Sequence, residues 1–220
     1  MLCRLAAALV PPVGRLNVTA ADGARFAPGS IIAANHTSLA DPAVVLAALR
    51  GLGVEPVVMA AAGLWRIPLL GRALAREEHI PVHRGDRRAV EALDTAAEAL
   101  GRGRLVLIYG EGGLPRREDP GEAAPRPFRS GLARLTRSTG APVVPLGQAG
   151  ARRIVSGSRP KQMAGLVTAP LRRPGVHVHV GAPVVLTGTH AARTAHAHRA
   201  VTAAWRIAAE RLGERLVPDA

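Results

Sequence analysis

The chain has 220 residues, of which 48% are hydrophobic and 2% aromatic, and it carries a formal net charge of +13. This length suits one α/β domain with a sizeable core and leaves little room for a second full domain, while the single cysteine, Cys3, excludes an intramolecular disulfide and a cysteine metal cluster. The basic charge is spread along the chain with few aromatic residues, which argues against a nucleic-acid motif or a stacking platform for single strands.

The first segment of the chain is apolar and short. The run after Met1 ends at Pro11 and Pro12, so it is too short to span a bilayer, and it lacks the cleavage-type segment of a secretory signal. No later apolar run reaches transmembrane length without a charge or a proline. We therefore expect a cytoplasmic protein with a short amphipathic segment over residues 1–14 that contacts the inner face of the cell membrane, followed by one domain over 15–220.

A histidine and an aspartate follow the first predicted strand. The apolar run Ile31–Ala34 leads into the polar segment Asn35–Asp41, and Pro42 then opens an apolar stretch typical of a helix. The polar segment therefore lies at the carboxyl end of a strand, where open α/β sheets keep their sites. Because a helix advances about 100° per residue, His36 and Asp41 meet only if a turn intervenes. In that case the carboxylate holds one imidazole nitrogen as N–H and leaves the other to accept a proton.

The same residues also fit a purely structural interpretation. Ser38 is a helix cap in this interpretation, and Asp41 three residues later completes a capping box. Alternatively, Asp41 itself caps the helix ahead of Pro42 at the first helical position. The spacing by itself leaves these alternatives open.

Strands and helices alternate through the rest of the chain, as expected for an α/β fold. Apolar residues at helical spacing predict a helix over 88–100, and a strand over 105–109 leads into the turn Gly110–Gly113, whose amides are able to approach an anion. The other predicted elements are a strand over 54–59, a short helix or turn-rich segment over 64–74, the segment 79–83, a proline-rich loop over 114–127, a helix from 130 to 140, a strand at 143–144, a basic, loop-rich excursion over 152–173 that faces a membrane, a strand over 176–181 and a final helix over 193–216.

Two histidines alternate along one of these strands. His177 and His179 share a face, so a pair of metal ligands is geometrically allowed. No third ligand stands at a telling spacing, and we expect no metal site here.

Several blocks, in order, resemble the glycerolipid acyltransferases, the family that includes lysophosphatidate and glycerol-3-phosphate acyltransferases. Asn35–Asp41 resembles the family's Asn-His-x-Ser-x-x-Asp block. The further blocks, within about residues 15–190, are 64–71, 80–86, 105–112, 128–131 and 141–146. The resemblance implies one acyltransferase domain with a mixed, largely parallel central sheet flanked by helices.

The resemblance also implies an activity and the residues that carry it. A fatty acyl group would pass from acyl-CoA or acyl carrier protein to the hydroxyl of a lysophospholipid such as 1-acyl-glycerol-3-phosphate, with no cofactor and no metal. His36 would be the general base and Asp41 the residue that orients it. The positions that match the substrate-binding blocks are Asn35, Ser38, Arg84, Glu111 and Gly112.

The third block departs from the family pattern. The usual Pro-Glu-Gly-Thr-Arg is replaced by Gly110–Leu114, so its arginine is missing, and Arg116 or Arg117 in the following loop is the expected substitute. A solvated charged loop is the alternative interpretation. Since Glu111 repels a phosphate, we expect it to fix the turn or an arginine, and we expect Arg84 to hold more of the acceptor phosphate.

Two other classes of function remain open from the sequence. A catalytically silent relative would use the fold to bind lipid or membrane, and a basic nucleic-acid binder would show steep salt dependence. The favoured partners are an acyl-CoA or acyl carrier protein, a lysophospholipid acceptor and an anionic membrane surface, with no nucleic acid.

Overall fold

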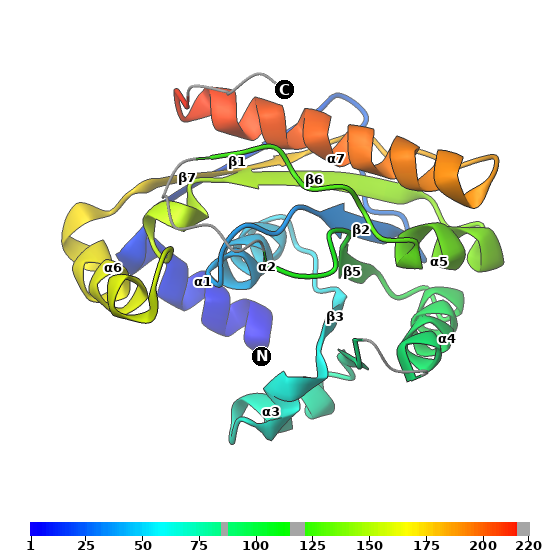
Figure 1. Cartoon of the computed structure of the whole chain (residues 1–220), viewed down its shortest axis with the longest axis horizontal. Coiled ribbons are helices and arrows are strands. Elements are labelled where there is room, and N and C mark those ends of the chain that lie inside the picture. The colour runs from blue at the N-terminus through cyan, green and yellow to red at the C-terminus, as the bar shows by residue number, and fades with distance from the viewer. Residues whose placement is uncertain (85–87, 115–121, 215–220) are drawn as a thin grey trace.

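The computed structural model describes residues 1–84, 88–114 and 122–214, which build one sheet with helices on both faces (Figure 1). The sheet order within these residues is β1-β7-β6-β2-β5-β3-β4. The strands are β1 (Arg15–Ala20), β2 (Ile31–Ala34), β3 (Val57–Ala61), β4 (Ile80–Val82), β5 (Val106–Tyr109), β6 (Val143–Ala149) and β7 (Gly175–Val180). Every described strand pair is parallel except β6 with β7. The α/β fold with a mixed, largely parallel sheet is confirmed.

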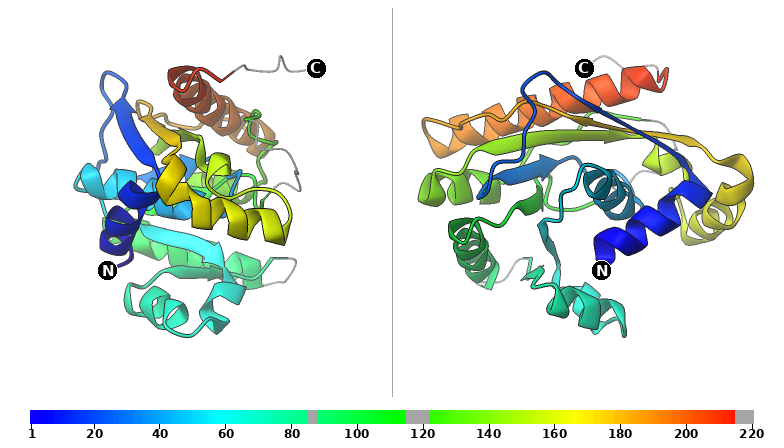
Figure 2. Two further views of the ribbon diagram at one scale, coloured as in Figure 1. Left: turned by 90° about the vertical axis from the view of Figure 1, so that its left-hand side faces the viewer. Right: turned by 180° about the vertical axis from the view of Figure 1, so that it is seen from behind.

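The helices form two layers that enclose this sheet. They are α1 (Leu2–Val13), α2 (Asp41–Gly51), α3 (Leu70–Arg76), α4 (Arg88–Gly101), α5 (Gly131–Thr139), α6 (Arg159–Arg172) and α7 (His190–Arg211), with short 3-10 turns η1 (Ala62–Arg66) and η2 (Ala151–Arg153). One core joins the sheet to α1, α2 and α6, and a second joins it to α4, α5 and α7. A smaller third cluster joins the end of β6 to the later part of α7. In Figures 1 and 2, α7 lies along the opposite face of the sheet from α1 and α2.

Strand β2 lies at the centre of the sheet between β5 and β6. Its side chains alternate between the two cores, with Ile32 and Ala34 in one and Ile31 and Ala33 in the other. All four residues are fully buried. An unbroken apolar run is what a parallel strand covered on both faces requires, and the run therefore fixes where the following polar loop emerges.

Most of the predicted elements are present, and the largest error concerns residues 152–173. This basic segment was predicted to be loop-rich, whereas it contains the helix α6. Pro160 falls in the first helical turn, where a missing N–H costs nothing. Gly165 packs where an added Cβ would lie 2.5 Å from the Ile154 carbonyl oxygen. Both residues thus serve the helix rather than interrupt it.

Smaller differences concern the ends of elements. The helix α1, at Leu2–Val13, lies within the predicted segment 1–14, contains Pro11 and Pro12, and packs against α2. Strand β1 was not predicted, and β6 runs to Ala149 instead of stopping at Val144. The final helix begins earlier than predicted because Thr189 caps it by accepting the Ala192 N–H (3.2 Å), and it ends at Arg211.

Candidate active site

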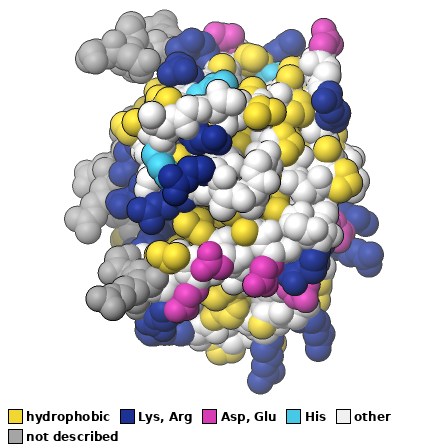
Figure 3. Space-filling model, turned by 90° about the vertical axis from the view of Figure 1, so that its right-hand side faces the viewer, with side chains coloured by type: hydrophobic (Ala, Val, Ile, Leu, Met, Phe, Trp, Pro, Cys, Tyr) yellow, Lys and Arg dark blue, Asp and Glu magenta, His cyan; other side chains and the backbone are white. Residues whose placement is uncertain are grey.

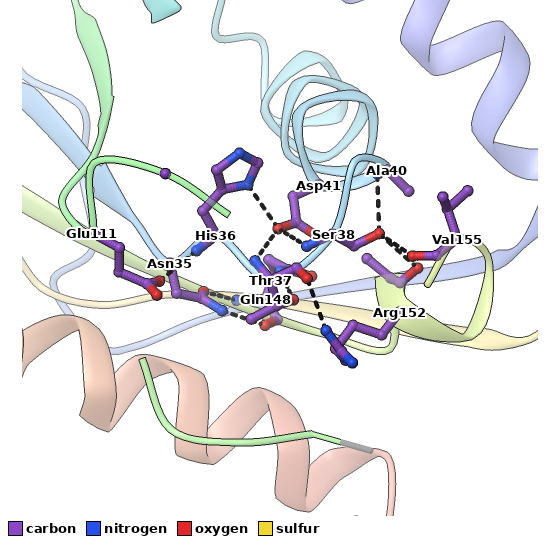
Figure 4. A network of polar contacts seen from close by, with 12 residues as sticks. Asn35, His36, Thr37, Ser38, Ala40, Asp41, Glu111, Gln148, Arg152 and Val155 are labelled. Atoms are coloured by element: carbon purple, nitrogen blue, oxygen red, sulfur yellow. Dashed lines mark hydrogen bonds and ion pairs between the residues drawn. The ribbon is translucent and has the colours of Figure 1, made fainter. Parts of the chain in front are cut away.

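The polar loop 35–40 emerges from the carboxyl end of β2, beside the end of the neighbouring strand β5 (Figure 4). The imidazole of His36 lies with Nδ1 3.0 Å from Oδ2 of Asp41, the first residue of α2. The turn that the spacing required is therefore present. The Asp41 carboxylate is fully buried, and the His36 side chain is 12% exposed. With Nδ1 held as N–H by the carboxylate, Nε2 is the nitrogen left to accept a proton.

The same carboxylate also organises the start of α2. Asp41 Oδ2 accepts the backbone N–H groups of Thr37 at 2.5 Å and Ser38 at 2.8 Å. The Ser38 hydroxyl accepts the N–H of Ala40 at 3.1 Å. Helix α2 nevertheless has Ala40 at its N-cap and no side-chain cap, so neither Ser38 nor Asp41 is the helix cap. The Asp41 carboxylate instead fixes both the loop and the imidazole.

Two residues of the loop that were grouped with the substrate-binding positions have buried side chains. Asn35 is fully buried, and its amide donates to the Gln148 carbonyl (3.0 Å) and accepts the Gln148 N–H (2.8 Å). Ser38 is 3% exposed, and its hydroxyl donates to the Val155 carbonyl at 2.6 Å. Both side chains are hydrogen-bonded to backbone groups, those of Asn35 to β6 and that of Ser38 to the segment after η2. Such contacts are typical of residues that position a loop.

Buried polar residues outside the predicted set support the loop. Gln148 Nε2 donates to the Thr37 hydroxyl at 3.2 Å, and Arg152 Nη1 donates to the Thr37 carbonyl at 3.1 Å. Gln148 is fully buried and Arg152 is 2% exposed. A glutamine inside an otherwise apolar strand is the sequence signal for this role, since buried polar groups need partners.

Tyr109 is a further site residue that the sequence did not single out. Its ring lies against the His36 imidazole with centroids 4.4 Å apart and planes tilted by 30°. Burial, and secondarily the charge of Asp41, raises the pKa of the Tyr109 hydroxyl well above its usual value. The phenol therefore stays neutral and limits the rotation of the imidazole. Its position at the end of β5, directly before the third block, was the available signal.

Glu111 joins the loop after β5 to the loop after β2. One carboxylate oxygen accepts the His36 N–H at 2.7 Å, and the other accepts the Arg126 N–H at 3.2 Å and lies 3.6 Å from Arg126 Nε. Burial raises the pKa of the Glu111 carboxyl, and the two N–H donors partly offset this effect. The contacts agree with the expectation that Glu111 fixes a turn and an arginine.

Three exposed arginines surround the glycine turn that follows Glu111. An added Cβ on Gly113 would lie 3.0 Å from Arg84 Nη1, and one on Gly112 would lie 2.5 Å from Cδ of Arg129. Arg126 Nη2 donates to the Gly113 carbonyl at 2.8 Å. Gly112 adopts a φ of 69°, in the left-handed region that favours glycine.

We call Arg84, Arg126 and Arg129 the arginine cluster. The structure thus places the predicted Arg84 at the predicted turn and adds Arg126 and Arg129, neither of which was among the predicted site residues, although Arg129 lies in the block 128–131. The expected substitutes Arg116 and Arg117 lie outside the described residues.

The segment 122–128, which we call the strap, carries Arg126, and two hydrogen bonds help to hold it in place. Glu122 accepts the Gly150 N–H at 2.7 Å, and His198 Nε2 lies 2.8 Å from the Pro125 carbonyl. An added Cβ on Gly110 would lie 2.3 Å from the Phe128 ring, so the strap packs directly on the turn. Arg126 is therefore presented from a fixed backbone.

The strand histidines have a structural explanation. His177 Nε2 and His179 Nδ1 each lie 2.9 Å from the Thr19 hydroxyl on β1. Burial, and secondarily Arg211, lowers the pKa of both imidazoles. They therefore link β1 to β7 across the parallel ladder.

A hollow of about 300 Å³ lies on another face, between α4, α5 and the start of α7. Its lining includes Leu93, Arg134, Arg137 and His190. Figure 3 views this end of the molecule, which carries exposed basic side chains beside a histidine and lies opposite α6. The hollow contains none of the residues of the His36 loop.

Across residues 1–84, 88–114 and 122–214, no helix combines the length and the apolarity needed to cross a bilayer.

Comparison with known proteins identifies the family and the fold of the chain. The sequence model of the family described as Acyltransferase matches residues 15–148. The chain is 29% identical over 126 residues to the chloroplastic 1-acyl-sn-glycerol-3-phosphate acyltransferase of Brassica napus, a match that covers 57% of this chain and 34% of the relative's own length.

The fold is similar to that of PlsC from Thermotoga maritima, a 1-acyl-sn-glycerophosphate (LPA) acyltransferase. The TM-score is 0.70 and the sequence identity 19%, and the match covers 97% of this chain and 78% of that chain. At this identity the similarity concerns the fold.

Proposed function

The chain belongs to the acyltransferase family, and from this premise we propose that it transfers a fatty acyl group from a thioester to the hydroxyl of a lysophospholipid. The donor is acyl-CoA or acyl carrier protein, and 1-acyl-glycerol-3-phosphate is the type of acceptor that best suits the site. The observation that carries the proposal is the His36 and Asp41 pair, joined at 3.0 Å at the carboxyl end of the central strand.

The proposed chemistry uses His36 as general base. Its Nε2 removes the proton of the acceptor hydroxyl while the oxygen attacks the thioester carbonyl carbon. The tetrahedral intermediate then collapses, the carbon–sulfur bond breaks, and the proton on His36 passes to the departing thiolate. The products are an ester and a free thiol, and the route needs alignment of the two substrates but no enzyme nucleophile.

The arginine cluster supports an acceptor that carries a phosphate. Arg84, Arg126 and Arg129 bring three cations to one glycine turn, and Glu111 is the acidic side chain that contacts this group. Guanidinium groups bind phosphate oxygens in pairs, which fixes orientation as well as charge. Glu111 also holds the His36 backbone, so the phosphate site and the base are joined through one side chain.

The first experiment measures thiol release from long-chain acyl-CoA with a panel of lysophospholipids and glycerol phosphate. Release should depend on an acceptor and fall by about 100-fold or more in His36→Ala, because general-base catalysis contributes that much. His190→Ala, at the start of α7, is the matched control and should retain full release.

The alternatives predict different results in the same assay. If neither acyl-CoA nor acyl carrier protein yields release above that of His36→Ala, the catalytically silent lipid-binding interpretation replaces this proposal. Tight, strongly salt-dependent binding of DNA or RNA that His36→Ala leaves unchanged would favour the nucleic-acid interpretation.

A second experiment addresses the acceptor site. Arg84→Ala and Arg126→Ala should each raise the KM for a phosphate-bearing acceptor by about tenfold, the effect of losing one charge-assisted contact, and should change kcat little. Arg137→Ala, an exposed arginine on α5, is the control. An unchanged acceptor KM in both variants would remove the assigned phosphate role.

A further inference from the structure

Helix α6 turns an apolar face toward solvent. Met163, Leu166, Val167 and Leu171 are 62%, 46%, 70% and 90% exposed. Their spacing places them on one side of the helix. Helices on soluble proteins ordinarily bury such a stripe, and an exposed apolar patch of this kind typically marks a binding surface. We call these four residues the α6 stripe.

The orientation of α6 is fixed by its opposite side. Ala169 is fully buried, and an added Cβ on Gly165 would lie 2.5 Å from the Ile154 carbonyl oxygen. Arg172 Nη1 also donates to the Arg153 carbonyl at 3.1 Å. Small residues thus let the helix approach the body closely, and a simple rotation that buried the stripe would drive larger side chains into this contact.

The charge of this helix selects the kind of partner. The segment 159–173 contains Arg159, Lys161, Arg172 and Arg173 and no acidic residue. An apolar face on a helix whose charged residues are all basic is the pattern of a helix that lies in the interface of an anionic bilayer. We propose that the α6 stripe docks the protein on an anionic lipid surface, with the helix lying in the plane of the bilayer.

The segment before α6 contacts the His36 loop, which connects the proposed docking surface to the site. Val155, four residues before α6, accepts the Ser38 hydroxyl at 2.6 Å, and Arg152 donates to the Thr37 carbonyl at 3.1 Å. Leu39 in the same loop is 60% exposed. Figure 2 shows α6 crossing one end of the molecule beside α1. Docking through α6 therefore brings the loop to the lipid surface, where a lysophospholipid resides.

Helix α1 extends the same surface. Arg173 Nη2 donates to the Pro11 carbonyl at 3.3 Å, which joins the ends of the two helices. Leu5 and Leu9 of α1 are 50% and 56% exposed, and α1 contains no acidic residue. The docking surface is thus centred on α6 and adjoined by the segment that the sequence predicted to contact a membrane.

The test is co-sedimentation of the full chain with vesicles of phosphatidylglycerol and phosphatidylcholine, compared with vesicles of phosphatidylcholine alone. The wild type should bind the anionic vesicles, and the double variant Val167→Asp, Leu171→Ser should lower the partition coefficient by about tenfold or more. Val185→Asp is the matched control, because Val185 is 64% exposed and its neighbour Val184 pairs with Val143 at the start of β6.

A charge variant tests the choice of lipid. Arg159→Glu with Lys161→Glu should weaken binding to anionic vesicles by about tenfold or more, and added salt should weaken the wild type. Equal binding to neutral vesicles would overturn the proposal. Binding that the α6 stripe variant leaves unchanged would also overturn it.

Two further readouts separate this proposal from its alternatives. If sedimentation velocity shows a dimer that Leu171→Ser dissociates, the stripe is an interface between copies of the chain and the proposal fails. His36→Ala should keep its vesicle binding, and the stripe variant should keep its thiol release with a water-soluble short-chain acceptor. Failure of the chemistry and failure of the docking are therefore distinguishable.

Discussion

At the residue scale, Glu111 is the side chain that joins the His36 loop to the backbone of Arg126. It accepts the backbone N–H of His36 with one oxygen and that of Arg126 with the other. The carboxyl is 5% exposed, and burial raises its pKa. Burying a carboxylate costs free energy, and this cost is offset when the carboxylate accepts hydrogen bonds from donors that would otherwise lack an acceptor. The two backbone N–H groups are such donors.

Glu111→Ala should therefore destabilise the fold by about 1–3 kcal/mol, the cost of leaving buried N–H groups unpaired. Glu111→Gln should cost less, because its single amide oxygen retains one of the two acceptors. Urea unfolding measures both changes. Glu210→Gln, on the exposed side of α7, is the control and should stay within about 0.5 kcal/mol of the wild type. Equal stability of the wild type and Glu111→Ala would contradict the role assigned to Glu111.

At the element scale, the contact between β6 and α7 positions the floor of the site. Gly147 of β6 lies directly under the helix, and an added Cβ would stand 2.0 Å from the backbone nitrogen of Trp205 and 2.1 Å from the carbonyl carbon of Ala204. These are backbone atoms, so no side-chain rotation relieves the overlap. The adjacent Gln148 holds Asn35, and the register of β6 is thereby coupled to the His36 loop.

Gly147→Ala should destabilise the protein by about 3 kcal/mol or more, since overpacking against backbone forces the helix and the strand apart. The comparison is Gly51→Ala at the end of α2, where an added Cβ meets nothing within 4 Å. That variant should be neutral or stabilise by up to about 1 kcal/mol through its better helix propensity. Chemical denaturation followed by circular dichroism measures both, and comparable stabilities would refute the packing argument.

At the scale of the whole molecule, buried histidines make hydrogen bonds near both edges of the sheet, close to β1 and close to β4. His79 Nδ1 accepts the Val58 N–H at 3.1 Å, next to β4, while His177 and His179 contact Thr19 next to β1. Burial is the largest cause that lowers the pKa of each imidazole from its ordinary value of 6.5. The unfolded chain therefore binds more protons than the folded one between these lowered pKa values and 6.5.

The stability contribution of these histidines is fully present above pH 6.5 and is lost as the pH falls toward their lowered pKa values. Glu111 and Glu122, whose pKa values burial raises, act in the opposite direction as the pH falls toward 4.5. A variant of one histidine isolates the contribution of that histidine to the pH dependence of stability. His79→Asn keeps an acceptor for the Val58 N–H but does not titrate.

We expect the midpoint of thermal unfolding to fall less between about pH 7.5 and pH 5.5 in His79→Asn than in the wild type. These two pH values lie about one unit on either side of the ordinary histidine pKa. His190→Asn, at the start of α7, is the matched control and should follow the wild type. Calorimetry at several pH values measures the difference. Parallel curves for the wild type and His79→Asn would show that His79 does not couple folding to pH.

The amino-acid sequence determined the features that depend on local pattern. The apolar run Ile31–Ala34, the periodicity over 88–100 and the glycine after 139 fixed the central strand and two helices. The same pattern placed His36, Asp41 and Glu111 at strand ends, because neighbouring parallel strands deliver their exits to one edge of a sheet. The prediction of a loop-rich segment over 152–173 missed α6, which spans Arg159–Arg172.

Only the tertiary structure decided which distant residues meet. Arg126 reaches the turn because Glu122 is bonded to Gly150, just after β6, and Pro125 is bonded to α7. Tyr109 meets His36 because β5 pairs with β2. The direction of the α6 stripe likewise follows from the contact of Gly165 with Ile154. Each of these arrangements is set by long-range packing, and the period of a sequence reveals which face of an element is apolar but not what that face meets.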